Sequence, residues 1–153
     1  YPLMKILVFS DSHGAVEPMT QAILEERPDQ VLHLGDYVRD GAKLHALQIP
    51  MLQVAGNCDY GSTEPTILTP VFAGVKFYMT HGHLHGVKSM YYRVIHAALA
   101  ANADILLFGH THRAECFQDQ GIWIMNPGAC GPMGSYGVIQ LSDGEIQCCV
   151  KSI

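Results

Sequence analysis

The first two thirds of the chain alternate between two hydrophobic patterns. Short apolar runs rich in β-branched residues predict buried strands, and apolar residues at helical spacing lie between several of them. The predicted strands are residues 5–10, 30–34, 51–54, 75–80 and 105–109. The predicted helices are residues 17–27, a weaker segment at 39–47, and residues 89–102. In the first helix, the expected buried face carries Met19, Ile23 and Leu24.

After the fifth predicted strand the pattern changes to short β-rich runs separated by turn residues. These runs predict strands at residues 115–118, 122–126, 136–141 and 145–150. They are expected to form antiparallel hairpins. The two patterns together predict an α/β fold in a single domain over residues 1–153, with two sheets packed face to face and helices outside. Residues 1–3 precede Met4, the expected natural start, and are interpreted as an added remnant.

Composition and charge exclude several classes of partner. The 9 basic and 14 acidic side chains give a formal charge of −5, and Lys and Arg are never gathered into a run. This balance argues against binding to extended nucleic acid or to an anionic membrane. No uncharged apolar stretch approaches the length of about 18 residues that a membrane span needs. We therefore expect a soluble protein, and a homo-oligomer stays open.

The five cysteines indicate a reducing compartment. They show no CxxC spacing, and no secretory signal is recognised ahead of them. Reduced thiols in the cytoplasm fit this usage best. Cys148 and Cys149 are adjacent, so in a strand they are expected to face opposite sides and not to form a disulfide with each other.

Polar side chains able to bind a metal ion follow every strand of the parallel half. One Asp or His after a strand is more often a turn residue or a helix cap, so no single position carries weight. The whole set is different, because ligands of α/β sheets bind beyond the carboxyl ends of the strands, where these side chains would converge. The candidate metal ligands are Asp11, His13, Asp36, Asn57, His81, His110 and His112.

Seven ligands of mixed nitrogen and oxygen type exceed what one tetrahedral zinc ion needs. They suit two divalent ions of higher coordination number bridged by a carboxylate, and Mn²⁺ or Fe²⁺ fits the ligand mix. Glycines adjoin nearly every candidate ligand, which permits tight turns and close backbone approach.

The order of these motifs resembles that of the calcineurin-like metallophosphoesterase family. The matching motifs are DSH at 11–13, GD at 35–36, GNCD at 56–59, HG at 81–82 and GHTH at 109–112. The short length, the THGH motif and the late Asn126-Pro127-Gly128 are most similar to the YfcE-type branch of small phosphodiesterases. The resemblance implies a four-layer α/β/β/α sandwich of two mixed sheets.

The resemblance also implies a role for each candidate ligand. Asp11, His13 and His112 would hold one metal ion. Asn57, His81 and His110 would hold the other, and Asp36 would bridge both. A metal-bridging hydroxide would attack the phosphorus of a small phosphodiester. Mn²⁺ is the expected metal, with Fe²⁺, Ni²⁺ and Zn²⁺ as alternatives.

Cys58 departs from the family pattern. Many relatives carry a histidine there that is thought to protonate the leaving group, and a cysteine is a poorer general acid. One hypothesis is that the enzyme favours leaving groups that need little protonation, or that His83 or His85 supplies the proton. The alternative is that Cys58 only packs against a metal ligand. The candidate catalytic residues are therefore Asn57, Cys58 and His83.

Two alternatives to the phosphodiesterase remain at this stage. A phosphomonoesterase would use the same metal ions and differ only in its substrate pocket, whose residues are unknown. A non-catalytic scaffold is the other, because one relative of this fold is a subunit of the retromer coat that has lost part of its metal site. No such loss occurs in this sequence.

Overall fold

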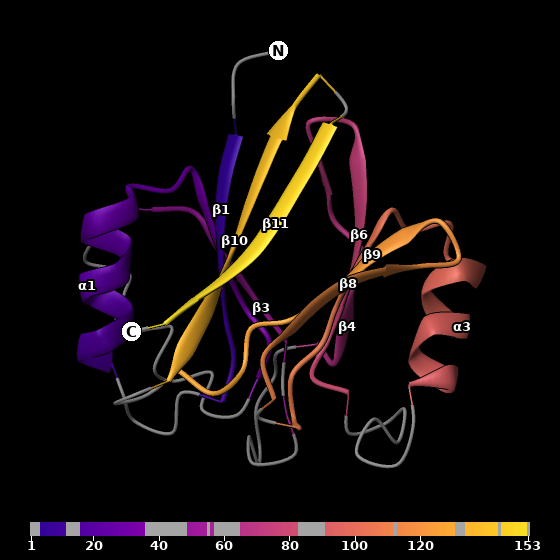
Figure 1. The fold of residues 1–153 in the computed structure, drawn as a ribbon, viewed down its shortest axis with the longest axis horizontal. Helices are drawn as coiled ribbons and strands as arrows, with labels where there is room; N and C mark the ends of the chain where they lie inside the picture. Colours follow the sequence, from indigo (N-terminus) through magenta and orange to yellow (C-terminus); the bar gives the residue numbers. More distant parts are fainter. Residues whose placement is uncertain are drawn as a thin grey trace.

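Two mixed β-sheets and two helices make up the part of the chain that the structure describes (Figure 1). The structure is a computed structural model. It describes residues 4–11, 16–35, 49–54, 56, 65–82, 91–111, 113–130, 134–143 and 145–152.

The first sheet has β1 at its centre. Its strand order is β11-β10-β1-β2-β3, with β1, β2 and β3 parallel and β10 antiparallel to both β1 and β11. The strands are β1 (Met4–Phe9), β2 (Gln30–His33), β3 (Met51–Gln53), β10 (Ser135–Ser142) and β11 (Glu145–Ser152). The helix α1 (Val16–Glu26) connects β1 to β2. This is the βα unit that the hydrophobic pattern predicts.

The second sheet is built around three parallel strands. Its order is β4-β6-β7-β9-β8, with β5 pairing β6 off this path, and the parallel strands are β6, β7 and β9. The strands are β4 (Ile67–Leu68), β5 (Val71–Phe72), β6 (Val75–Thr80), β7 (Ile105–Leu107), β8 (Glu115–Asp119) and β9 (Ile122–Asn126). The helix α3 (Tyr92–Ala100) lies between β6 and β7 in the sequence.

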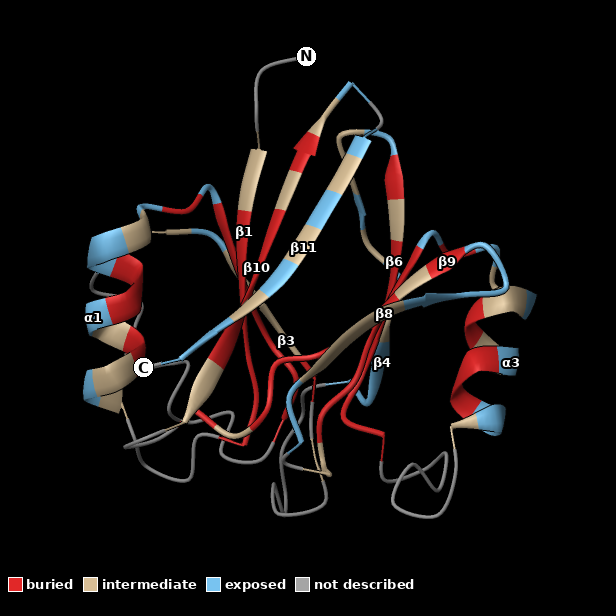
Figure 2. Ribbon diagram, in the orientation of Figure 1, coloured by how far each residue is buried: buried red, intermediate tan, exposed pale blue. Residues whose placement is uncertain are grey.

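The layers follow from which side chains are buried together. One core cluster lies between the sheets, with Val8 and Leu32 from the first sheet and Phe77 and Leu107 from the second. A second cluster packs α1 on the outer face of the first sheet, and a third packs α3 on the outer face of the second. Figure 2 shows buried residues at the sheet centres and exposed residues on the outer sides of both helices. The described elements thus form an α/β/β/α arrangement, as predicted.

The helix predicted at 39–47 lies outside the described residues. The other predicted elements agree closely with the observed ones, with two differences. The short strands β4 and β5 were not predicted. Leu24 was wrongly placed on the buried face of the first helix, because its side chain is 61% exposed and Ala22 is buried instead. No helix in the described ranges is long and apolar enough to span a membrane.

Glu26, the last residue of α1, joins three elements through one carboxylate. Its oxygens accept hydrogen bonds from Lys5 Nζ of β1 at 2.6 Å and Lys151 Nζ of β11 at 2.8 Å. The Tyr136 hydroxyl of β10 donates a third at 2.9 Å. These bonds, with Lys151 as the largest influence, lower the pKa of Glu26 from 4.5 to about 2. The folded state therefore favours the ionised carboxylate.

Replacing Glu26 by Gln is expected to lower the free energy of unfolding at pH 7 by about 1 to 3 kcal/mol, with part of the gross ion-pair energy lost to solvent screening. Because the folded pKa lies below the unfolded one, this contribution is present above pH 4.5 and disappears as the pH falls towards 2. Urea unfolding at pH 7 and at acid pH measures it. Glu25→Gln, on the exposed side of α1, is the control. If Glu26→Gln lowers the free energy of unfolding by the same amount at both pH values, the stabilising role of the ionised Glu26 carboxylate is contradicted.

Candidate metal centre

Asp11 lies two residues beyond the end of β1, and its carboxylate is buried. Its Oδ2 accepts hydrogen bonds from the Ser10 hydroxyl at 2.6 Å and from the backbone N–H of His110 at 3.0 Å. Its own N–H donates to the carbonyl of Gly35 at 3.0 Å, which ties the ends of β1 and β2 together. These contacts fix the plane of the carboxylate.

His81 follows β6 and is fully buried. Its Nδ1 lies 2.9 Å from the backbone carbonyl oxygen of Leu34. A carbonyl only accepts hydrogen bonds, so Nδ1 carries the proton, and in the neutral ring Nε2 carries the lone pair. Nε2 lies 3.1 Å from Nδ1 of His110 and 3.7 Å from Oδ1 of Asp11. A histidine whose second nitrogen donates to a backbone carbonyl is a common arrangement for a metal ligand.

His110 follows β7 and brings the second sheet to the same place. Its ring centroid lies 4.9 Å from that of His81. The N–H of Gly109 donates to the carbonyl of His81 at 2.9 Å, so the ends of β6 and β7 are joined. The structure thus brings together Asp11 from the first sheet and two histidines from the second.

The backbone at the site adopts conformations that L-residues rarely take. Asp11 has a φ of 53° and His110 a φ of 69°. Such left-handed conformations cost about 1 to 3 kcal/mol and persist only where the surroundings enforce them. Other described non-glycine residues with positive φ lie at helix ends or hairpin turns, and they are Arg27, Ala73, Asn102, Gln120 and Asp143. At Asp11 and His110 the strain instead falls on two candidate ligands.

Two glycines permit the close approach of these segments. A Cβ on Gly109 would lie 2.0 Å from Ser10 Oγ and 2.9 Å from Asp11 Oδ2. A Cβ on Gly35, which has a φ of 106°, would lie 2.7 Å from the backbone nitrogen of Gly56 and 3.0 Å from Nδ1 of His81. Neither position has space for a side chain.

The spacing of the two histidine nitrogens suits a shared divalent metal ion. Two nitrogens that bind one ion at about 2.1 Å, with an angle of about 90° at the ion, lie about 3.0 Å from each other. The distance between Nε2 of His81 and Nδ1 of His110 is 3.1 Å, which matches this value. Within the described ranges, no three His, Cys, Asp or Glu side chains form a group that could hold a metal ion by themselves. The other predicted site residues, His13, Asp36, Asn57, Cys58, His83 and His112, lie outside those ranges.

Sequence reasoning missed the side chains and the carbonyl that hold the candidate ligands. Ser10 binds Asp11, the Leu34 carbonyl binds His81, and Asn126 binds the loop around His110. A Ser directly before an Asp at the end of an apolar run, and an Asn at a strand end before Pro and Gly, were the available signals.

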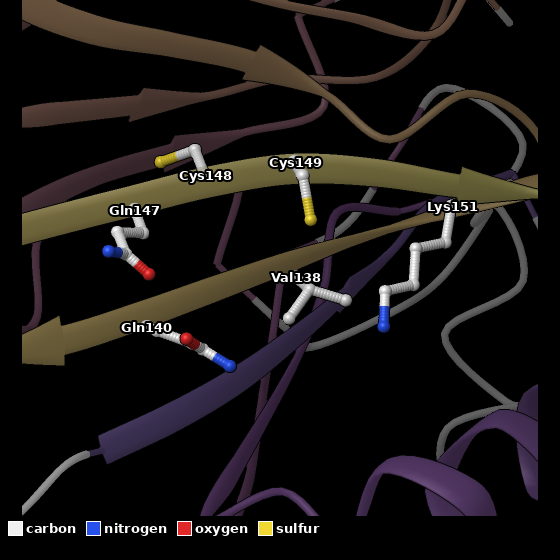
Figure 3. Close-up of a pocket in the computed structure, with 6 residues that line it drawn as sticks. All are labelled: Val138, Gln140, Gln147, Cys148, Cys149 and Lys151. Carbon is white, nitrogen blue, oxygen red and sulfur yellow. The ribbon is translucent and has the colours of Figure 1, made fainter.

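A groove of about 240 Å³ lies elsewhere, along β10 and β11. None of its lining residues is a predicted site residue (Figure 3). Cys149 and Cys148 point to opposite sides of β11 in this view, as expected of neighbours in a strand. Both are free thiols.

Comparison with known proteins decides the family. Residues 4–144 match the family model described as the calcineurin-like phosphoesterase superfamily domain. The chain belongs to this superfamily. The predicted resemblance, and with it the predicted class of metal-dependent phosphoesterase, is confirmed.

Three relatives of this superfamily illustrate the similarity. A probable metallophosphoesterase, YsnB of Bacillus subtilis strain 168, is 35% identical over 129 residues, 82% of this chain and 75% of the relative. Phosphodiesterase YfcE of Escherichia coli K12 is 27% identical over 169 residues, 90% of this chain and 88% of the relative. The crystal structure of a predicted phosphoesterase from Streptococcus pneumoniae TIGR4 superposes with a TM-score of 0.84 at 25% identity, covering 99% of this chain and 91% of the other.

Proposed function

We propose that this superfamily member is a dinuclear, metal-dependent phosphodiesterase that hydrolyses small phosphodiesters. The observation that carries the proposal is the state of His81, whose Nδ1 donates to Leu34 while Nε2 faces Nδ1 of His110 and Oδ1 of Asp11. This arrangement directs Nε2 of His81 towards His110, its expected partner on the same ion, with the carboxylate of Asp11, a ligand of the neighbouring ion, 3.7 Å away. The name of the YfcE relative, a phosphodiesterase, supports the choice of a diester substrate.

The candidate ligands divide between two metal positions. Asp11, His13 and His112 would hold one ion. Asn57, His81 and His110 would hold the other, with Asp36 shared. When bound, two divalent ions would supply Lewis acidity that lowers the pKa of water and stabilises charge on the phosphoryl oxygens. Mn²⁺ suits this mixture of oxygen and nitrogen donors.

The chain's own residues prepare this site before any ligand binds. Ser10 and the His110 N–H hold Oδ2 of Asp11, so the carboxylate cannot rotate freely. The Leu34 carbonyl keeps the proton of His81 on Nδ1. Because these groups are already oriented, little reorganisation is needed when metal and substrate bind. Either the leaving group would need little protonation, or His83 or His85 would supply the proton in place of Cys58.

Chelator-stripped protein is expected to be inactive, and Mn²⁺ should restore hydrolysis of bis(p-nitrophenyl) phosphate at a higher kcat/KM than that of p-nitrophenyl phosphate. Release of p-nitrophenol measures both reactions, and Asp36→Ala is the control that should stay inactive. A faster monoester reaction would identify a phosphomonoesterase. No reaction with Mn²⁺, Fe²⁺, Ni²⁺ or Zn²⁺ would favour the non-catalytic scaffold. The cytoplasmic location and the oligomeric state stay predictions of the sequence.

A further inference from the structure

Asn126 ends β9 with a fully buried side chain that makes three hydrogen bonds. Its Nδ2 donates to the carbonyl of Gly109 at 3.3 Å and to Oγ1 of Thr111 at 2.7 Å. Its Oδ1 accepts from the N–H of Gly128 at 2.9 Å. The amide oxygen thus binds the loop that follows β9, and the amide nitrogen makes two bonds to the segment around His110.

The residues that Asn126 holds lie on either side of His110. β9 is the parallel neighbour of β7, so the end of β9 lies beside the loop that follows β7. Within that loop the N–H of Thr111 donates to the carbonyl of Gly109 at 2.8 Å, which closes a tight turn around His110. The Asn126 amide contacts both ends of this turn.

His110 is consequently held from two directions. Its backbone N–H donates to Oδ2 of Asp11, in the first sheet, and its two neighbours are bound by Asn126. The left-handed conformation of His110, with a φ of 69°, needs such support because it is intrinsically unfavourable. In this conformation the ring places Nδ1 at 3.1 Å from Nε2 of His81.

We propose that Asn126 is a positioning residue for metal binding, which acts through Thr111 and Gly109 to hold His110 in the conformation that aligns it with His81. The proposal rests on the proposed function, because it assumes that His110 is a ligand. Groups that orient metal ligands typically change metal affinity by about 10- to 100-fold when they are removed. A purely structural role would change the free energy of unfolding and leave metal affinity intact.

The Thr111 hydroxyl allows the sharpest test, since Thr111→Val removes the acceptor at nearly constant volume and Thr111→Ser keeps it. Mn²⁺ binding to chelator-stripped protein, measured by isothermal titration calorimetry, is expected to weaken by about 10- to 100-fold in Thr111→Val and to stay near the wild-type value in Thr111→Ser. Asn126→Ala should weaken it similarly. The matched control is Ile124→Ala, a buried residue of the same strand that packs with α3. It should lower stability without changing Mn²⁺ affinity.

Three outcomes overturn the inference in different ways. If folded Thr111→Val and Asn126→Ala bind Mn²⁺ as tightly as the wild type, Asn126 is structural and the proposed function stands. If Ile124→Ala weakens binding as much as Thr111→Val, the effect is one of general stability and the inference also fails. Wild-type protein that binds none of Mn²⁺, Fe²⁺, Ni²⁺ and Zn²⁺ would instead remove the proposed function, and this inference with it.

Discussion

Replacing Asp11 by Asn is expected to lower the Mn²⁺-dependent kcat/KM for a phosphodiester by about 10³-fold or more, with the fold retained. The loss is expected because Oδ2 of Asp11 accepts hydrogen bonds from two donors, the Ser10 hydroxyl and the His110 N–H. In the variant, the amide oxygen has to occupy that position, and the NH₂ group then takes the place of Oδ1, 3.7 Å from Nε2 of His81. An NH₂ group is a donor and does not bind a cation.

The measurement compares this variant with one at a matched position. Asp143 lies in the turn between β10 and β11 and has a φ of 50°, close to the 53° of Asp11. Asp143→Asn removes one carboxylate charge from a similar backbone conformation, and it should retain wild-type activity. Circular dichroism establishes that both variants are folded. Activity of Asp11→Asn above a tenth of the wild-type value would contradict the role of Asp11 as a ligand.

Replacing Gly109 by Ala should lower both the free energy of unfolding and the affinity for Mn²⁺. The added Cβ would lie 2.0 Å from Ser10 Oγ and 2.9 Å from Asp11 Oδ2, so either the loop or Ser10 has to move. If Ser10 moves, Asp11 loses one of the hydrogen bonds that orient it. We expect the free energy of unfolding to fall by about 2 to 4 kcal/mol. Mn²⁺ affinity should fall by about 10- to 100-fold.

Urea unfolding and Mn²⁺ titration measure the two effects of Gly109→Ala separately. Gly74→Ala is the control, because Gly74 has a φ of 79° but no heavy atom within 4 Å of the added Cβ. It should cost about 1 kcal/mol of backbone strain and leave Mn²⁺ affinity unchanged. Adding Ser10→Gly to Gly109→Ala should recover part of the lost stability. A Gly109→Ala variant as stable as the wild type would mean that the loop shifts without cost.

Most of the fold could be predicted because its main strands are continuous apolar runs. β6 and β9 begin and end where the pattern places them, and α3 ends before Asn102, whose φ of 58° suits a helix terminus. β4 and β5 are each two residues long, which is too short to show the alternation of apolar and polar residues that predicts a strand. The hydrophobic pattern also does not specify the order of the strands within each sheet.

The candidate ligands could be predicted by residue type, but the groups that orient them could not. Asp11, His81 and His110 each follow a buried strand, a local feature of the sequence. The bond from Asn126 to Thr111 depends on β9 lying beside β7, and that from His81 to Leu34 joins the two sheets. Such contacts follow from tertiary arrangement, which single-sequence patterns do not encode.

The central place of β1 in its sheet has a consequence for biosynthesis. Met4 pairs with Leu141, so one neighbour of this strand is translated long after the strand itself. Contacts between residues far apart in the sequence form slowly, because the chain loses conformational entropy in closing the loop before the contact stabilises the fold. During translation β1 therefore emerges well ahead of β10, with one hydrogen-bonding edge and much of its apolar surface unpaired. Completion of the first sheet has to wait until β10 has left the ribosome, and the nascent chain is the form most exposed to aggregation.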